Sequence, residues 1–192
     1  MTSPEHFPFA VLVMCTGNIC RSPAVERLLT AGLDASVYVR SAGTHAMVGE
    51  PISAPMGPLI KAAGANPDHF AARQVTETTV RQADLVLTMT REHRGAAVDL
   101  WPGAVRRTFT LREYARALGF INLSEVPTGL SQGQRLAAVT PMAAVMRGQG
   151  QPHDPKDDDV VDPYRESPEV YRRSFEQFEP AVRTIVRIAR GD

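Results

Sequence analysis

The chain has 192 residues, equal numbers of acidic and basic side chains, and 43% hydrophobic residues. This length predicts one globular domain over residues 1–192, because domains commonly contain roughly 100–200 residues. Formal neutrality argues against nucleic acid or an anionic membrane as a partner, since binding either requires a basic excess on one face.

The amino-terminal residues and the two cysteines bear on the cellular location. Residues 1–8 lack the positive charge and apolar stretch of a signal peptide, and no segment approaches the ~18 apolar residues of a membrane span. Cys15 and Cys20 are too few for a disulfide framework. We therefore expect a cytoplasmic protein without membrane insertion, whose cysteines are either buried fillers or reactive groups.

Apolar strands alternate with helical patterns along the first part of the chain. We expect strands at residues 9–14, 37–39, 85–89 and 105–110, and helices at 23–33, 54–63, 90–100 and 111–118. Residues 9–14 are apolar without alternation, which is typical of a strand covered on both faces. The alternation predicts right-handed crossovers and an open parallel α/β sheet. Ser22 is the expected N-cap of the first helix.

Residues 119–159 differ in character, because Gly, Pro, Gln and Ser become frequent and only 130–145 has a helical pattern. A loop of this length is unusual inside a compact domain, so the segment is either a flexible insertion or a functional flap, and we favour an insertion. The last helix is expected at 168–189, with Ser167 as its N-cap and one apolar face.

Residues 15–22, C-T-G-N-I-C-R-S, connect the first strand to its helix, where open α/β sheets bind ligands. Gly17 permits a tight turn, so the backbone amides and the helix N-terminus can form an anion-binding nest. These groups and Arg21 favour a thiolate at Cys15, which is therefore the expected nucleophile. The planar guanidinium of Arg21 matches two oxygens of a phosphoryl group, and the Ser22 hydroxyl can bond the sulfur.

Other interpretations of this loop are two buried cysteines beside a turn, or half of a metal site. A metal site needs more thiolates or nearby histidines, and the five histidines are far away in the sequence, so we expect no metal or other cofactor. A Walker-type nucleotide site is excluded, because no Gly-Lys-[Ser/Thr] follows the first strand.

The loop resembles the signature of the low-molecular-weight protein tyrosine phosphatases, which has Cys, five residues, Arg and Ser around an inner G-N-I-C. Segments 41–44, 48–51, 72–74 and 83–89 also resemble this family, and the resemblance covers about residues 9–118 and 160–189. It implies a three-layer, phosphatase I-like α/β fold with a four-stranded parallel sheet in the order 2-1-3-4. It also implies metal-independent hydrolysis of phosphotyrosine and small aryl phosphates through a phosphocysteine. The expected phosphate-binding residues are Thr16, Gly17, Asn18, Ile19, Cys20, Arg21 and Ser22.

The family resemblance implies a general acid in a D-P-[YF] motif before the last helix, and Asp162-Pro163-Tyr164 matches it. An acid there protonates the departing phenolic oxygen. Asp154 also precedes a proline and 157–159 is an acidic run, but such runs are usually solvated. We therefore assign the role to Asp162.

By the same resemblance, Tyr164 and Met47 form opposite walls of the substrate pocket. The aliphatic Met47, together with Arg165 in place of a second tyrosine, resembles the bacterial members that act with tyrosine kinases of polysaccharide export. The expected partner is therefore a phosphotyrosine protein, such as an autophosphorylated bacterial tyrosine kinase, and the expected state is a monomer or weak dimer.

Two positions depart from the family pattern and leave questions open. Phe70 stands where some relatives have a histidine that supports the loop asparagine, and Thr90 stands where an aspartate is common. Cys20 either forms a protective disulfide with Cys15 on oxidation or is only a packing thiol. The alternatives for function are a thioredoxin-coupled arsenate reductase, which needs a third cysteine that is absent after Cys20, and a non-catalytic phosphate-binding scaffold.

Overall fold

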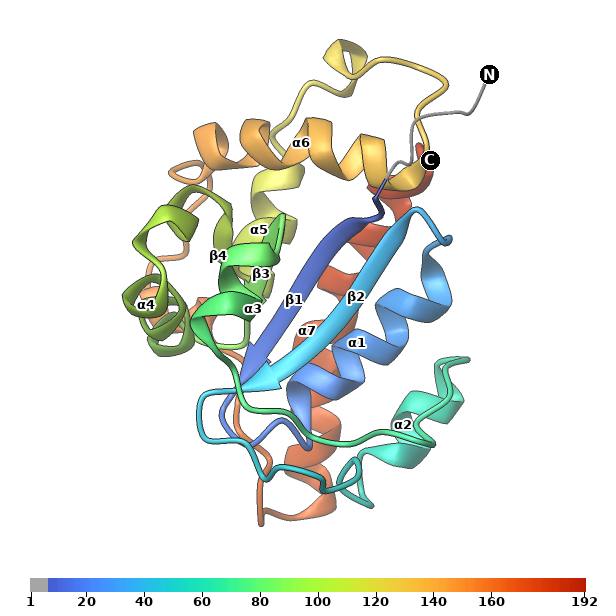
Figure 1. Ribbon diagram of the computed structural model, residues 1–192, viewed down its shortest axis with the longest axis vertical. Helices are drawn as coiled ribbons and strands as arrows, with labels where there is room; N and C mark the ends of the chain where they lie inside the picture. Colours follow the sequence, from blue (N-terminus) through green and yellow to red (C-terminus); the bar gives the residue numbers. More distant parts are fainter. Residues whose placement is uncertain (1–6) are drawn as a thin grey trace.

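A parallel four-stranded sheet forms the middle layer of the computed structural model, which describes residues 7–192 (Figure 1). Its strands β1 (Phe9–Cys15), β2 (Val37–Gly43), β3 (Leu85–Thr88) and β4 (Thr108–Thr110) stand in the order β2-β1-β3-β4. The predicted fold class and strand order are therefore confirmed. In the register, Cys15 pairs with Gly43 and Met14 with Thr88, so the carboxyl ends of three strands meet at one edge.

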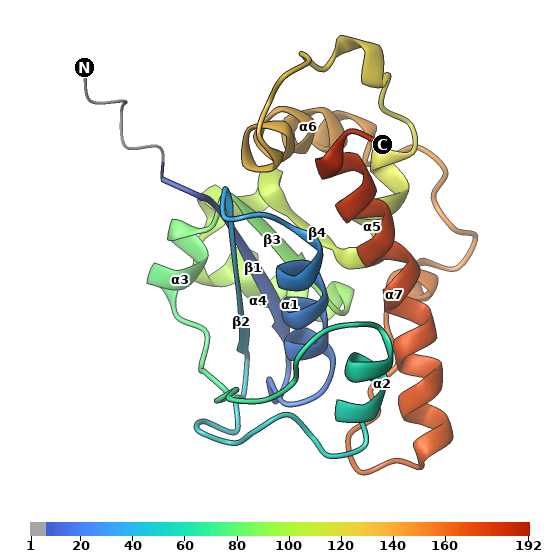
Figure 2. The ribbon, with the colours of Figure 1, turned by 90° about the vertical axis from the view of Figure 1, so that its right-hand side faces the viewer.

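Helices cover both faces of the sheet (Figure 2). One face carries α1 (Arg21–Gly32), α5 (Leu111–Leu118) and α7 (Pro168–Arg190), and the other carries α3 (Glu77–Gln82), α4 (Arg91–Leu100) and the 3-10 helix η1 (Pro102–Arg107). Strand β1 sends Val11 and Val13 into the first core and Leu12 and Met14 into the second. Its unbroken apolar sequence thus reflects burial on both faces.

Several predicted boundaries are wrong at their ends. The second strand extends to Gly43 because its pairing with β1 continues to the end of both strands. The helix expected at 54–63 is only α2 (Gly57–Ala62), because residues 54–56 form a turn. The fourth strand has three residues, since a 3-10 helix with Pro102 in its first turn occupies 102–107. Helix α3, capped by Thr76, was not predicted.

Helix α7 begins after Ser167, as predicted, and ends at Gly191, whose φ of 87° is the left-handed conformation that favours glycine. Its apolar face packs against α1 and α5. The buried residues of this face are Tyr171, Ser174, Phe178, Ala181, Val182, Ile185, Ile188 and Ala189. None of the helices in residues 7–192 combines the length and apolar character needed to cross a membrane.

Residues 119–159 contain the 3-10 helices η2 (Leu123–Glu125) and η3 (Pro155–Asp158) and, between them, α6 (Gln132–Met146). Helix α6, close to the predicted 130–145, lies across the amino ends of the strands (Figure 1). Its buried residues Leu136, Val139 and Ala143 join the core.

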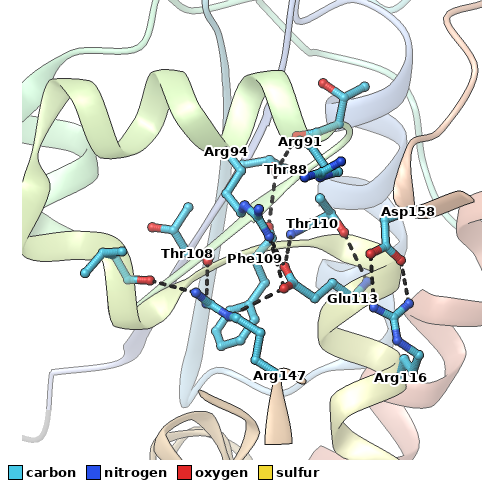
Figure 3. A network of polar contacts seen from close by, with 12 residues as sticks. Thr88, Arg91, Arg94, Thr108, Phe109, Thr110, Glu113, Arg116, Arg147 and Asp158 are labelled. Carbon is cyan, nitrogen blue, oxygen red and sulfur yellow. Dashed lines mark hydrogen bonds and ion pairs between the residues drawn. The ribbon is translucent and has the colours of Figure 1, made fainter. Parts of the chain in front are cut away.

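A cluster of charges around the buried Glu113 ties this segment to the sheet (Figure 3). The Glu113 carboxylate of α5 lies 2.9 Å from Nη1 of Arg94 and 3.4 Å from Nε of Arg147, the residue that ends α6. The Arg147 guanidinium also donates to the Thr108 carbonyl at 2.7 Å and lies 4.2 Å above the ring of Phe109. The end of α6 is therefore held by β4 and α5, and Glu113 is shared with Arg94 of α4.

Candidate active site

The loop from Cys15 to Ser22 links β1 directly to α1. Helix α1 begins at Arg21, with Cys20 at the N-cap position and no side-chain cap, so the predicted N-cap role of Ser22 is wrong. The Ser22 hydroxyl instead lies 2.9 Å from the sulfur of Cys15. Because this oxygen also accepts the Asn18 amide at 2.9 Å, its own hydrogen is free to point at the sulfur.

Asn18 holds the turn of the loop from inside the protein. Its φ is 53°, a left-handed conformation that costs energy for a residue with a side chain, and the residue is fully buried. Its amide group donates to Ser22 and to Ser41, at 2.8 Å for the latter, and accepts the backbone N–H of Arg73 at 2.8 Å. These bonds fix the loop amides in place.

The support continues behind Asn18 through a buried carboxylate. The Ser41 hydroxyl donates to Glu26 of α1, and a guanidinium nitrogen of Arg73 lies 3.8 Å from the same carboxylate. Phe70 is buried, with the Arg73 guanidinium 5.4 Å from its ring centre. The open question at Phe70 is thus answered, because the backbone of Arg73 supports Asn18 and the Phe70 ring packs beneath the arginine.

The loop forms the floor of a pocket of about 270 Å³ at the carboxyl end of β1. Met47 and Tyr164 stand at its mouth, each 39% exposed, and Asn18 and Ser22 lie buried behind it. The lining residues are Cys15, Thr16, Gly17, Ile19, Cys20, Arg21, His45, Met47, Asp162 and Tyr164. A larger cavity of about 930 Å³ at the amino ends of the strands is lined by neither cysteine nor histidine, so the reactive groups gather in the smaller one.

Arg21 and Asp162 meet in this pocket. Nη2 of the buried Arg21 lies 2.5 Å from a carboxylate oxygen of Asp162, whose side chain is 49% exposed. Nη1 donates to the Val160 carbonyl at 3.1 Å, and Nε is buried without a hydrogen-bond partner among residues 7–192. The rival Asp154 instead caps η3 through the backbone N–H of Lys156. The pocket can therefore offer a tetrahedral oxyanion a charged fork of donors beside a thiol and a carboxyl group.

Cys20 has a different environment from Cys15, although both are free, buried and line the pocket. Its sulfur lies 3.7 Å from the hydroxyl of Tyr171, which is bonded to Ser53 at 2.8 Å. Burial raises the pKa of the Cys20 thiol, and the hydrogen bond to Tyr171 partly opposes this rise. Cys20 is therefore held as a thiol.

His93 was not among the predicted site residues, because it lies far from residues 15–22 in the sequence. His93 is buried on α4, with Nε2 2.9 Å from the hydroxyl of Thr16 and Nδ1 2.8 Å from the hydroxyl of Thr90. Thr90, the unexplained departure, is the N-cap of α4 and accepts the backbone N–H of His93. The sequence did contain a signal for His93, because the helix cap Thr90 and His93 follow directly after β3, the strand beside β1. Neighbouring parallel strands end at the same edge of a sheet, so residues after β3 lie near the loop after β1.

Comparison with known proteins gives matches over most of the chain. Residues 10–140 match the family described as "Low molecular weight phosphotyrosine protein phosphatase". The low molecular weight protein-tyrosine-phosphatase Etp of Escherichia coli (strain K12) is 36% identical over 105 residues, which is 55% of this chain and 70% of the relative. A protein-arginine-phosphatase of Geobacillus stearothermophilus is 35% identical over 107 residues, 56% of this chain and 72% of the relative. The solved structure of the Erwinia amylovora tyrosine phosphatase AmsI superposes with a TM-score of 0.67 at 23% identity, over 96% of this chain and 95% of that one.

Proposed function

The chain belongs to the low molecular weight phosphotyrosine protein phosphatase family, and we propose that Cys15, Arg21 and Asp162 carry out its hydrolysis of phosphotyrosine. The observation that carries this proposal is the meeting of the thiol, the guanidinium and the carboxyl group in one pocket. An arsenate reductase mechanism is not favoured, since no third cysteine follows Cys20.

In the first step, the sulfur of Cys15 attacks phosphorus in line, and the bond to the tyrosyl oxygen breaks. The loop amides and Arg21 hold the other phosphoryl oxygens. The unpartnered Nε of Arg21 supports this assignment, because a phosphoryl oxygen would satisfy it while another competes with Asp162 for Nη2. Protonated Asp162 gives its proton to the tyrosyl oxygen.

In the second step, the Asp162 carboxylate takes a proton from water, which attacks the phosphocysteine. Phosphate leaves, and the sulfur returns as a thiolate beside the Ser22 hydroxyl, which stabilises it. The 49% exposure of the Asp162 side chain supports this double role, because the carboxyl group must meet the departing tyrosyl oxygen in the first step and a water molecule that enters from solvent in the second.

The walls of the pocket favour an aromatic ester. Ile19, Met47 and Tyr164 line it, and a phenolic ring can stack on the tyrosine with a gain of about 0.5–1.5 kcal/mol beyond burial. A phosphoarginine side chain, suggested by the arginine phosphatase relative, would place a polar guanidino group against these apolar walls, where Asp162 is the one carboxylate among the lining residues. We therefore propose phosphotyrosine as the preferred substrate.

Turnover of a series of aryl phosphates tests these roles. We expect no turnover by Cys15→Ser, and for Asp162→Asn a loss of about 10²–10⁴-fold that grows as the leaving group becomes more basic. Asp154→Asn is the matched control, because it changes the other aspartate that precedes a proline and should leave turnover intact. If Asp162→Asn loses the same turnover with acidic and basic leaving groups, Asp162 is not the general acid. If the wild type releases phosphate faster from phosphoarginine peptides than from phosphotyrosine peptides, phosphotyrosine is not the preferred substrate.

We further propose a cytoplasmic enzyme, monomeric or weakly dimeric, that acts on an autophosphorylated bacterial tyrosine kinase. The aliphatic Met47 at the pocket mouth supports this partner, as does Arg165, whose guanidinium lies 5.1 Å from the ring centre of Tyr164. Release of phosphate from such a purified kinase, compared with an unrelated phosphotyrosine peptide, tests the preference. Equal rates of phosphate release from the two substrates would contradict the preference for the kinase. Cell fractionation would test the cytoplasmic location, and sedimentation analysis would test the oligomeric state.

We propose that residues 119–159 are an anchored insertion within a single domain, 1–192, and not a flap. The support is the burial of α6 and the charge cluster at its end, together with the ion pair of Arg116 with Asp158 in η3 (Figure 3). A protease would cleave a mobile flap before it cleaves the rest of the chain. We therefore expect limited proteolysis to spare 132–158 until the whole chain unfolds, and early cleavage there would contradict the proposal.

We propose that Cys20 protects Cys15 against irreversible oxidation. Peroxide oxidises Cys15 to a sulfenic acid, and the Cys20 sulfur then displaces hydroxide, which leaves as water, to form a disulfide. The position of both sulfurs on one short loop and one pocket supports this. Activity should return with added thiol after peroxide treatment of the wild type and not of Cys20→Ser, and equal recovery would defeat the proposal.

A further inference from the structure

A buried histidine connects α4 to the first residue after the proposed nucleophile. The ring of His93 lies between two threonine hydroxyls, 2.9 Å from that of Thr16 and 2.8 Å from that of Thr90. The backbone of His93 is also fixed, because its N–H donates to the Thr90 hydroxyl. The ring is thus held on α4 and reaches the loop from outside it.

This bridge can be made by a neutral imidazole. A neutral ring has one nitrogen that donates a hydrogen bond and one that accepts, and a threonine hydroxyl can either accept or donate. Either tautomer of His93 can therefore form hydrogen bonds with both threonine hydroxyls. Burial of His93, helped by the charge of Arg21 and opposed by that of Asp162, lowers its pKa to about 4. The ring is therefore neutral at neutral pH.

Thr16 is held from two sides. Its side chain is bonded to His93, and its carbonyl accepts the backbone N–H of His45 at 3.0 Å. Thr16 and the peptide that joins it to Gly17 are thereby fixed, and with them the Gly17 amide near the start of the anion nest. Neither contact comes from residues 15–22, so the loop does not determine this geometry by itself.

We propose that His93 is a positioning residue of the phosphatase reaction, which holds the Thr16 side chain and so the start of the phosphate-binding loop. The inference rests on the proposed role of that loop. His93 does not line the pocket of Cys15, so it acts through Thr16. Its loss should weaken the grip on phosphate and the in-line approach of Cys15 while the protein remains folded.

Steady-state kinetics with p-nitrophenyl phosphate and competitive inhibition by inorganic phosphate test the proposal. His93→Leu should lower kcat/KM about three- to ten-fold, the loss expected for one neutral hydrogen bond, and weaken phosphate inhibition by a similar factor. His93→Gln should restore most of both, because its amide can replace the ring nitrogen that meets Thr16. Thr16→Val should match His93→Leu, and the double variant should lose no more than either single variant, since both remove the same bond.

Thermal denaturation of each variant separates folding from positioning, and if His93→Leu does not fold, His93→Gln and Thr16→Val still carry the test. Equal defects in His93→Gln and His93→Leu, or losses that multiply in the double variant, would overturn the proposal in favour of simple packing of α4. Absence of turnover by the wild type would instead overturn the proposed function.

Discussion

Gly43, the last residue of β2, lies so close to the proposed phosphate-binding loop that a single methyl group should displace the loop. A Cβ atom at this position would be 2.3 Å from the carbonyl oxygen of Thr16 and 3.1 Å from both Cα and Cβ of Ala46. Ordinary contact begins near 3.4 Å, so the loop and the strand must separate by about 1 Å. No side-chain rotation can relieve a contact with a backbone carbonyl.

The displaced carbonyl belongs to the peptide that follows the one joining Cys15 to Thr16, so Gly43→Ala should impair catalysis more than folding. A misplacement of about 1 Å can cost about 10²-fold in rate, and overpacking typically costs ~1–3 kcal/mol of stability. We expect kcat/KM for an aryl phosphate to fall by about that factor at a temperature where the variant is folded, and Tm to fall by roughly 2–12 °C.

Gly95→Ala is the matched control for this variant. Gly95 lies within α4, and a Cβ atom there would meet nothing within 4 Å. The change should stabilise the helix by about 0.5–1 kcal/mol and leave kcat/KM unchanged. If Gly43→Ala keeps kcat/KM within about two-fold of the wild type, the proposed coupling of β2 to the loop geometry is wrong.

Two further predictions concern stability. Tyr114→Phe removes a buried hydroxyl that bonds Thr140 at 2.9 Å, so it should lower the free energy of unfolding, measured in urea, by about 0.5–1.5 kcal/mol. Tyr38 is 52% exposed, so the control variant Tyr38→Phe should change this free energy little. Equal effects would contradict the assigned bond between α5 and α6. Burial lowers the pKa of His93 from 6.5 to about 4, so the unfolded chain binds this proton more readily, and stability is lost as pH falls from 6.5 towards 4. The free energy of unfolding should fall by roughly 3 kcal/mol over this range, from 1.36 kcal/mol per pKa unit. Urea titrations at several pH values should show a smaller fall for His93→Gln, and the same pH dependence in the variant and the wild type would contradict the prediction.

The loop that carries the proposed nucleophile could be predicted because its determinants are consecutive in the chain. A strand end, a turn glycine, two cysteines, an arginine and a helix start all fall within a few residues, and each acts through local backbone geometry. The alternation of strands and helices is local in the same sense, and it correctly predicted the sheet. Element ends were less predictable, because Thr108–Thr110 follows a 3-10 helix and Gly57–Ala62 follows a turn, and the apolar pattern of the sequence does not mark where these begin.

Tertiary structure decided which distant groups reach the loop. Arg21 and Asp162 are 141 positions apart, and Thr16 and His93 are 77 apart, so no local pattern relates them. Sequence motifs could favour Asp162 over Asp154, whereas the one signal for His93 was its place beside a helix-cap residue just after the third strand. The physical reason is that strand register and helix packing bring such side chains together, and these depend on the whole core, whereas the chemistry of the loop is encoded in eight adjacent residues.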